Sequence, residues 1–143
     1  MSVVNGALNT LEARLPKVIN AQTHGLIDYG HAAFFLGAGW ILRKKNPRAA
    51  AAAYLTGTFV LTQSLLTDYP LGVKPLIPFE LHGKMDASFA AASLAIPKLF
   101  GFEKTKAATI YTTNAFVEAI AVGLTDFNSE RARVAQVARP SPQ

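Results

Sequence analysis

The chain contains an internal duplication, and this repeat constrains its fold more than any other feature. Shifting the sequence by 58 residues, the separation of His24 from His82, places H-G-x-x-D at 24–28 on H-G-x-x-D at 82–86. The same shift places L-T-D and an aromatic residue at 66–69 on the matching residues at 124–127. Self-similarity at a fixed period indicates one supersecondary unit built twice. We therefore expect two copies of one helical unit in tandem.

Each copy contains long segments that are almost free of charge. Three segments of nineteen residues carry at most one charged side chain each: 24–42, 49–67 and 107–125. The exceptions are Asp28 in the first segment and Glu118 in the third. A helix of this length reaches about 28 Å, close to the roughly 30 Å hydrocarbon core of a bilayer. Each of the three segments is therefore a candidate membrane span.

A fourth segment, 85–102, is apolar but contains Pro97 and Lys98. Proline removes a helical hydrogen bond, so we expect this helix to end early or to kink. Basic clusters lie midway in both halves and are typical of hairpin tips. The predicted fold is all-α, a transmembrane four-helix bundle made of two tandem helical hairpins related by a pseudo-two-fold axis.

The expected organisation is a single domain, 1–143, with five parts. They are an amphipathic lead-in helix at 1–22, a first helical hairpin at 23–69, a Pro-rich connector at 70–81, a second hairpin at 82–128 and a basic tail at 129–143. The connector contains three prolines, which forbid a continuous helix between the hairpins.

Composition favours the membrane over the alternative of a soluble four-helix bundle. Only 16% of the residues are charged, against roughly 25% in an ordinary soluble domain. The net charge of +5 comes from basic residues that flank apolar segments, a pattern that fits lipid headgroups and does not predict nucleic-acid binding. The chain has no cysteine, which excludes disulfides and thiolate metal sites.

The repeat predicts a cluster of ionisable residues at one end of the bundle. In antiparallel hairpins, the start of the first helix lies beside the end of the second. Two histidines and four carboxylates should therefore gather there: His24, Asp28, Asp68, His82, Asp86 and Asp126. Each H-x-x-x-D spacing puts the histidine and its aspartate one turn apart on one face of a helix.

One further polar pair departs from the repeat. His31 corresponds to Phe89 in the other half, and Glu118 corresponds to Val60. Counting about eight residues inward from the polar end along each helix puts the two ionisable groups at the same depth. An unpaired carboxylate at that depth would be costly, so we expect His31 to contact Glu118.

The residues leave several interpretations of the cluster open. It is either a structural His/Asp clasp or a metal site made only of nitrogen and oxygen ligands, which suits zinc, manganese or iron. The other readings are a proton or ion relay, haem or a pigment held by histidine, and an accessory subunit of a larger membrane complex, energy-transducing or transport, or a homo-oligomer. No phosphate-binding loop, nucleophile elbow or H-E-x-x-H motif is present, so the sequence gives no support for an enzyme.

Three motifs carry a resemblance to a known group of proteins. They are T-H-G-L-I-D-Y at 23–29, L-T-D-Y-P-L-G at 66–72 and P-F-E-L-H-G at 78–83. Over roughly residues 22–128 the chain resembles small bacterial four-helix membrane proteins related to the SPW-repeat group, which are also tandem two-helix duplications. The resemblance implies a bacterial inner (plasma) membrane location and this topology, and no chemistry.

Overall fold

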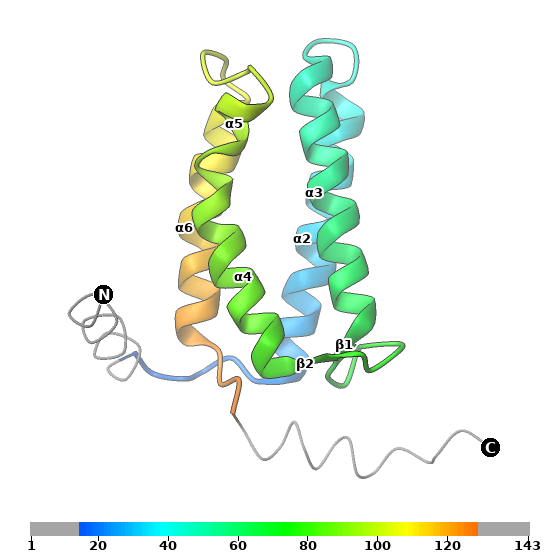
Figure 1. Ribbon diagram of the computed structural model, residues 1–143, viewed down its shortest axis with the longest axis vertical. Helices are drawn as coiled ribbons and strands as arrows, with labels where there is room; N and C mark the ends of the chain where they lie inside the picture. The colour runs from blue at the N-terminus through cyan, green and yellow to red at the C-terminus, as the bar shows by residue number, and fades with distance from the viewer. Residues whose placement is uncertain (1–14, 129–143) are drawn as a thin grey trace.

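The computed structural model describes residues 15–128, which form two helical hairpins side by side (Figure 1). The elements in chain order are α2 (Ala21–Leu42), α3 (Pro47–Leu66), β1 (Thr67–Asp68), β2 (Ile77–Pro78), α4 (Phe79–Ser93), α5 (Ile96–Leu99) and α6 (Ala108–Leu124). Helix α2 packs along α3, and α4 packs along α6. The all-α class and the tandem hairpins are therefore present as expected.

The helix ends of the first hairpin follow from local sequence. The Asn20 side chain accepts a hydrogen bond from the Thr23 backbone N–H at the start of α2, and Asn46 does the same for Ala49 at the start of α3. Asparagine is a favoured N-cap because its side chain satisfies an N–H that has no partner within the helix. Pro47 then occupies the first turn of α3, where its missing N–H costs nothing.

The second hairpin contains the interruption that Pro97 predicts. Helix α4 ends at Ser93, and the single turn of α5 follows after two residues. Pro97 has no N–H to donate to the carbonyl of Ser93, four residues earlier, so one helix cannot continue across this point. Helix α4 starts at Phe79, directly after Pro78 and three residues before the expected start of the second hairpin at 82.

Short pairings of extended backbone connect the two halves of the repeat crosswise. Ile77, before α4, pairs in parallel with Thr67 at the end of α3, and Ile19, before α2, pairs in parallel with Thr125 at the end of α6. These pairings are related by the 58-residue repeat. Residues 15–20 are not helical, and the rest of the expected lead-in helix and the basic tail at 129–143 lie outside the described residues.

Residue sizes inside and outside the bundle are the reverse of those in a typical soluble core. The larger cluster of buried residues consists of four alanines and three aromatic residues, Phe35, Phe102 and Tyr111. Large apolar side chains lie outside instead, for example Phe34, Trp40, Leu55, Phe116 and Ile120. Small residues between helices allow close backbone approach, which is typical of helices packed in lipid.

Length and composition single out one helix as a candidate span. Within the described residues, α3 alone is long and apolar enough to cross a membrane, while α6 is apolar but shorter. Buried helices of soluble proteins can have the same length and composition. Of the four membrane spans expected from the sequence, one is supported by the length and composition of its helix.

Candidate metal centre

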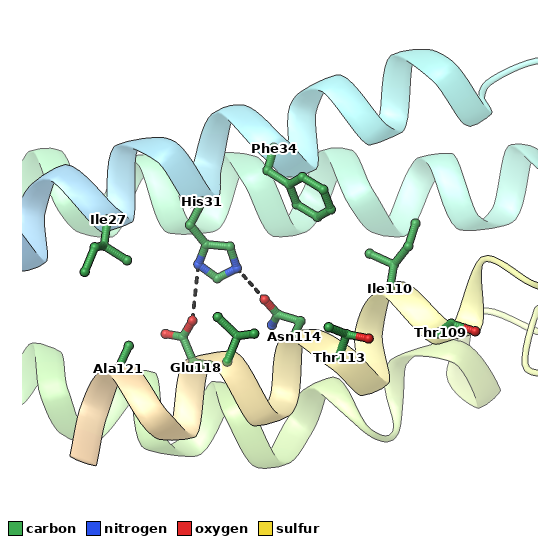
Figure 2. A pocket seen from close by; sticks show the side chains of 10 residues that line it. Ile27, His31, Phe34, Thr109, Ile110, Thr113, Asn114, Glu118 and Ala121 are labelled. Carbon is green, nitrogen blue, oxygen red and sulfur yellow. Dashed lines mark hydrogen bonds and ion pairs between the residues drawn. The ribbon is translucent and has the colours of Figure 1, made fainter. Parts of the chain in front are cut away.

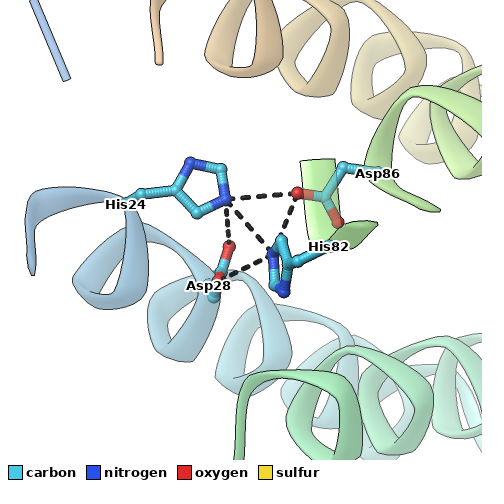
Figure 3. Close-up of side chains that lie close together, drawn as sticks. All are labelled: His24, Asp28, His82 and Asp86. Carbon is cyan, nitrogen blue, oxygen red and sulfur yellow. Dashed lines mark hydrogen bonds and ion pairs between the residues drawn. The ribbon is translucent and has the colours of Figure 1, made fainter. Parts of the chain in front are cut away.

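Four ionisable side chains from the two halves meet where the hairpins adjoin (Figure 3). His24 and Asp28 lie on α2, and His82 and Asp86 occupy the matching positions of α4. Each offers a ligand atom, and all four atoms lie within 4.8 Å of one another. All four residues are at least 94% buried. The H-x-x-x-D spacing produces this arrangement because residues four apart share a helix face.

The nitrogen and oxygen atoms converge at close and nearly equal distances. The two histidine Nε2 atoms lie 3.3 Å apart. His24 Nε2 lies 3.4 Å from Asp28 Oδ1 and 3.1 Å from Asp86 Oδ2. His82 Nε2 lies 3.3 Å from Asp28 Oδ2 and 3.0 Å from Asp86 Oδ2.

Two buried threonines fix which nitrogen of each histidine faces the centre. The hydroxyls of Thr67 and Thr125 donate to the carbonyl oxygens four residues earlier, at 2.7 and 2.6 Å. Each hydroxyl can then only accept from the histidine Nδ1 beside it, at 2.6 Å for His82 and 2.9 Å for His24. Both imidazoles therefore carry their proton on Nδ1 and direct Nε2 at the centre, the orientation that a partner outside the ligand shell imposes on metal-binding histidines.

The second oxygen of each carboxylate is also held. The Tyr69 hydroxyl donates to Asp28 Oδ2 at 3.1 Å, and the Gln63 amide donates to Asp86 Oδ1 at 2.6 Å. Burial and the neighbouring Asp28 carboxylate raise the pKa of Tyr69, so its hydroxyl keeps the proton that it donates. Asp86 faces both histidines through Oδ2, whereas Asp28 faces His24 through Oδ1 and His82 through Oδ2.

The net negative charge of the two histidines and two aspartates favours a cation at their centre. With the Nδ1 protons in place, the two Nε2 lone pairs face each other and two carboxylates complete the set. A buried group of this kind carries a net charge of −2, and burying uncompensated charge is costly. One divalent cation would neutralise it, and a proton on Nε2 would neutralise it in part.

Aromatic rings close the site from the outside. Gly25 lies under the ring of Tyr69, where an added Cβ would be 3.0 Å from the ring, and Gly83 lies under Phe127 in the same way at 2.7 Å. The two glycines and the two aromatic residues are again related by the repeat. Phe79 also packs edge-on against His24, with ring centroids 5.5 Å apart. Only glycine leaves room for rings this close to the helix backbone.

Asp68 and Asp126 do not join the four residues, contrary to the sequence-based expectation. Both are only partly buried, and Asp126 Oδ1 accepts a hydrogen bond from the Asn128 backbone. The preceding residues, Thr67 and Thr125, have extended backbone angles after the last helical turn. Successive side chains of extended backbone point to opposite sides, so the threonines face the histidines and the aspartates face away.

The residues that hydrogen-bond to the histidines and aspartates of the site differ in whether the sequence could have predicted them. The threonines recur in both L-T-D motifs, so the repeat itself contains a signal that we did not use. Gln63 and Tyr69 correspond to Ala121 and Phe127 in the other half, so the repeat gives no indication of their role.

The predicted pair of His31 and Glu118 is confirmed (Figure 2). His31 Nδ1 lies 3.2 Å from Glu118 Oε2. Its other nitrogen, Nε2, lies 2.6 Å from Asn114 Oδ1, a partner that the sequence analysis missed. The Asn114 amide group in turn donates to Ser93 at 3.1 Å, which orients Oδ1 toward His31.

Comparison with known protein families, with characterised proteins and with solved structures finds no match to this chain.

Proposed function

We propose that this protein is a small integral membrane protein whose two hairpins are held together by a Zn²⁺ ion bound to His24, Asp28, His82 and Asp86. The ion would connect α2 to α4, and thereby the first copy of the repeat to the second. Its role is structural, because four protein ligands fill a tetrahedral site and leave no position open for water or substrate.

The spacing of the ligand atoms carries this proposal. With metal–ligand bonds of about 2.0–2.1 Å, the corners of a zinc tetrahedron lie about 3.3–3.4 Å apart. Each histidine Nε2 lies 3.0 to 3.4 Å from the other Nε2 and from the nearest oxygen of each aspartate, with Asp28 facing His24 through Oδ1 and His82 through Oδ2. One ligand atom from each of the four residues lies within 4.8 Å of the other three. Small rotations of the side chains would bring all four ligand atoms to the tetrahedral separations around the ion. Manganese favours octahedral oxygen sites, which a set of two nitrogens and two oxygens suits less well.

The membrane location is supported by the surface of the bundle. Its exposed large apolar side chains lie along the helices, whereas the basic residues 43–48 and 98–106 lie in or near the hairpin tips at the end of the bundle opposite β1 and β2 (Figure 1). An exterior with many large apolar side chains and polar groups inside is costly in water and favourable in lipid. The relation to the SPW-repeat group and the bacterial inner membrane are part of the same proposal.

Metal analysis of the detergent-purified protein tests the site. We expect about one zinc per chain in the wild type and its loss in both His24→Ala and His82→Ala. His31→Gln is the matched control, because it alters a partly buried histidine of the same bundle outside the site, and it should retain the metal. Replacement of zinc by Co²⁺ should give the visible absorption bands of a tetrahedral complex. Retention of zinc in the two alanine variants would overturn the assignment.

A structural clasp without metal is the second candidate, and one distance favours it. The 3.3 Å between the two Nε2 atoms also suits a hydrogen bond, if one imidazole is protonated. A metal-free wild type whose melting temperature falls in both His24→Ala and His82→Ala would establish the clasp instead of the zinc site.

A further inference from the structure

A second polar site lies inside the bundle, in a pocket between α2 and α6 (Figure 2). The pocket has a volume of about 530 Å³. Ligand pockets in proteins are typically about 300–1,000 Å³, mostly apolar, with a few polar groups that fix orientation. Here the polar groups are the His31 and Glu118 pair, the Asn114 amide and the hydroxyls of Thr109 and Thr113.

The rim of this pocket is continuous with the outer apolar surface. Ile27, Phe34 and Val117 line it and are 39%, 56% and 56% exposed. A ligand would therefore reach the polar pair from the side of the bundle and not through the metal centre. For a protein embedded in a bilayer, this side faces the acyl chains.

The hydrogen bonds of the pair determine what charge the pocket can take. Asn114 Oδ1 accepts the proton on His31 Nε2, so a single proton lies between His31 Nδ1 and Glu118 Oε2. The pair is neutral with that proton and has a charge of −1 without it. Glu118 Oε1 has no hydrogen-bond partner among the described residues.

His31 is the one basic side chain in the described part of the pocket wall. Among the described residues that line the pocket, none is lysine or arginine. The two carboxylates that act on Glu118 through charge, those of Asp28 and Asp86, belong to the metal centre and disfavour a second negative charge here. The aromatic ring of Phe34 is also part of the wall, and the faces of aromatic rings attract cations.

We propose that this pocket binds a lipophilic cation, with its apolar body against Phe34 and Val117 and its positive charge beside the Glu118 carboxylate. The cation replaces the proton between Glu118 and His31, and that proton passes to water. No bond other than the O–H or N–H bond of that proton breaks. This site is separate from the proposed zinc site and does not depend on it.

Equilibrium dialysis of the detergent-purified protein with tetraphenylphosphonium tests the proposal. We expect saturable binding of about one cation per chain. Glu118→Gln keeps the size of the side chain and removes its charge, so it should weaken binding at least tenfold. Glu80→Gln is the matched control, because Glu80 is an exposed carboxylate outside the pocket, and it should bind as the wild type does.

Two further measurements guard against a misfolded variant and against simple partition into apolar surface. Val117→Trp fills the mouth at an exposed position without altering the pair, and it should also weaken binding. Triphenylphosphine oxide, a neutral aromatic analogue, should bind at least tenfold more weakly than the cation. Equal binding of the neutral analogue, unchanged binding in Glu118→Gln, or no saturable binding in the wild type would each overturn the proposal. The metal content of Glu118→Gln reports separately on the zinc site.

Discussion

The two polar sites of this bundle differ in their relation to the repeat. The four residues of the candidate metal centre come in equal pairs from both copies, and so do the threonines that orient the histidines. His31 and Glu118 have no polar counterparts, because the matching positions hold Phe89 and Val60. Both sites take residues from the two copies, but the metal centre uses equivalent positions of each copy, whereas His31 and Glu118 lie at positions that are not equivalent. Equivalent positions suit a site that joins the copies, and we expect the unpaired positions to serve a different ligand. We therefore assign a structural role to the metal centre and a separate, ligand-binding role to the site of His31 and Glu118.

Removal of the metal should have the largest effect and should affect only the symmetric site. An ion present at 1,000 times its dissociation constant stabilises a folded protein by about 4 kcal/mol. We expect excess chelator to lower the melting temperature of the detergent-solubilised wild type by an amount that reflects a loss of this order. Differential scanning calorimetry is the measurement.

Two variants show whether that loss arises at the centre. His24→Ala should melt at the lowered temperature already and should respond no further to chelator. His31→Gln should respond to chelator as the wild type does. A chelator effect of equal size in His24→Ala would mean that the ion binds elsewhere.

Glycine-to-alanine changes compare the two aromatic lids of the metal centre. An added Cβ at Gly25 would lie 3.0 Å from Tyr69 and 3.3 Å from Leu71, while one at Gly83 would lie 2.7 Å from Phe127. The Tyr69 ring is almost fully buried and hydrogen-bonded to Asp28, so it cannot move aside, whereas Phe127 is only partly buried. Overpacking costs about 1–3 kcal/mol, and we expect Gly25→Ala to lie at the upper end of this range.

Thermal unfolding of Gly25→Ala and Gly83→Ala measures which of the two variants loses more stability. A greater loss of stability in Gly83→Ala would show that Phe127 is fixed more firmly than its burial indicates. Serine at either position would add a hydroxyl as well as the Cβ, so alanine is the cleaner substitution.

The repeat allowed much of the fold and part of the site to be predicted. Both hairpins, the break before Pro97 and the contact of His31 with Glu118 follow from offset, charge spacing and helical rise. The error at Asp68 and Asp126 has a local cause. The last helical turn ends one residue before the threonines, and a change from helical to extended backbone reverses which side chain faces inward. Sequence periodicity does not locate that change to a single residue.

The orienting threonines should have equal effects if the symmetry of the centre is functional. Thr67→Val and Thr125→Val keep the shape of the side chain but remove the acceptor of the histidine Nδ1 proton. Loss of such a partner outside the ligand shell typically reduces metal affinity by about 10–100-fold. Competition with a chromophoric zinc chelator measures this affinity. A tenfold difference between the two variants would show that the histidines are not equivalent ligands.

The carboxylate partners break the symmetry, and here we expect the smallest effect. Tyr69 donates to Asp28, but its counterpart in the repeat is Phe127, so Tyr69→Phe makes the two lids alike. The variant loses one hydrogen bond to a charged group, which is worth about 1.5–3 kcal/mol when the acceptor stays buried, and less when a metal ion holds the other oxygen of the same carboxylate. We therefore expect a loss of about 1 kcal/mol with zinc bound and a larger loss after chelation. Urea unfolding with and without chelator measures both values. Equal losses in the two conditions would mean that Asp28 is not a ligand of the ion, and would leave His24, His82 and Asp86 to hold it.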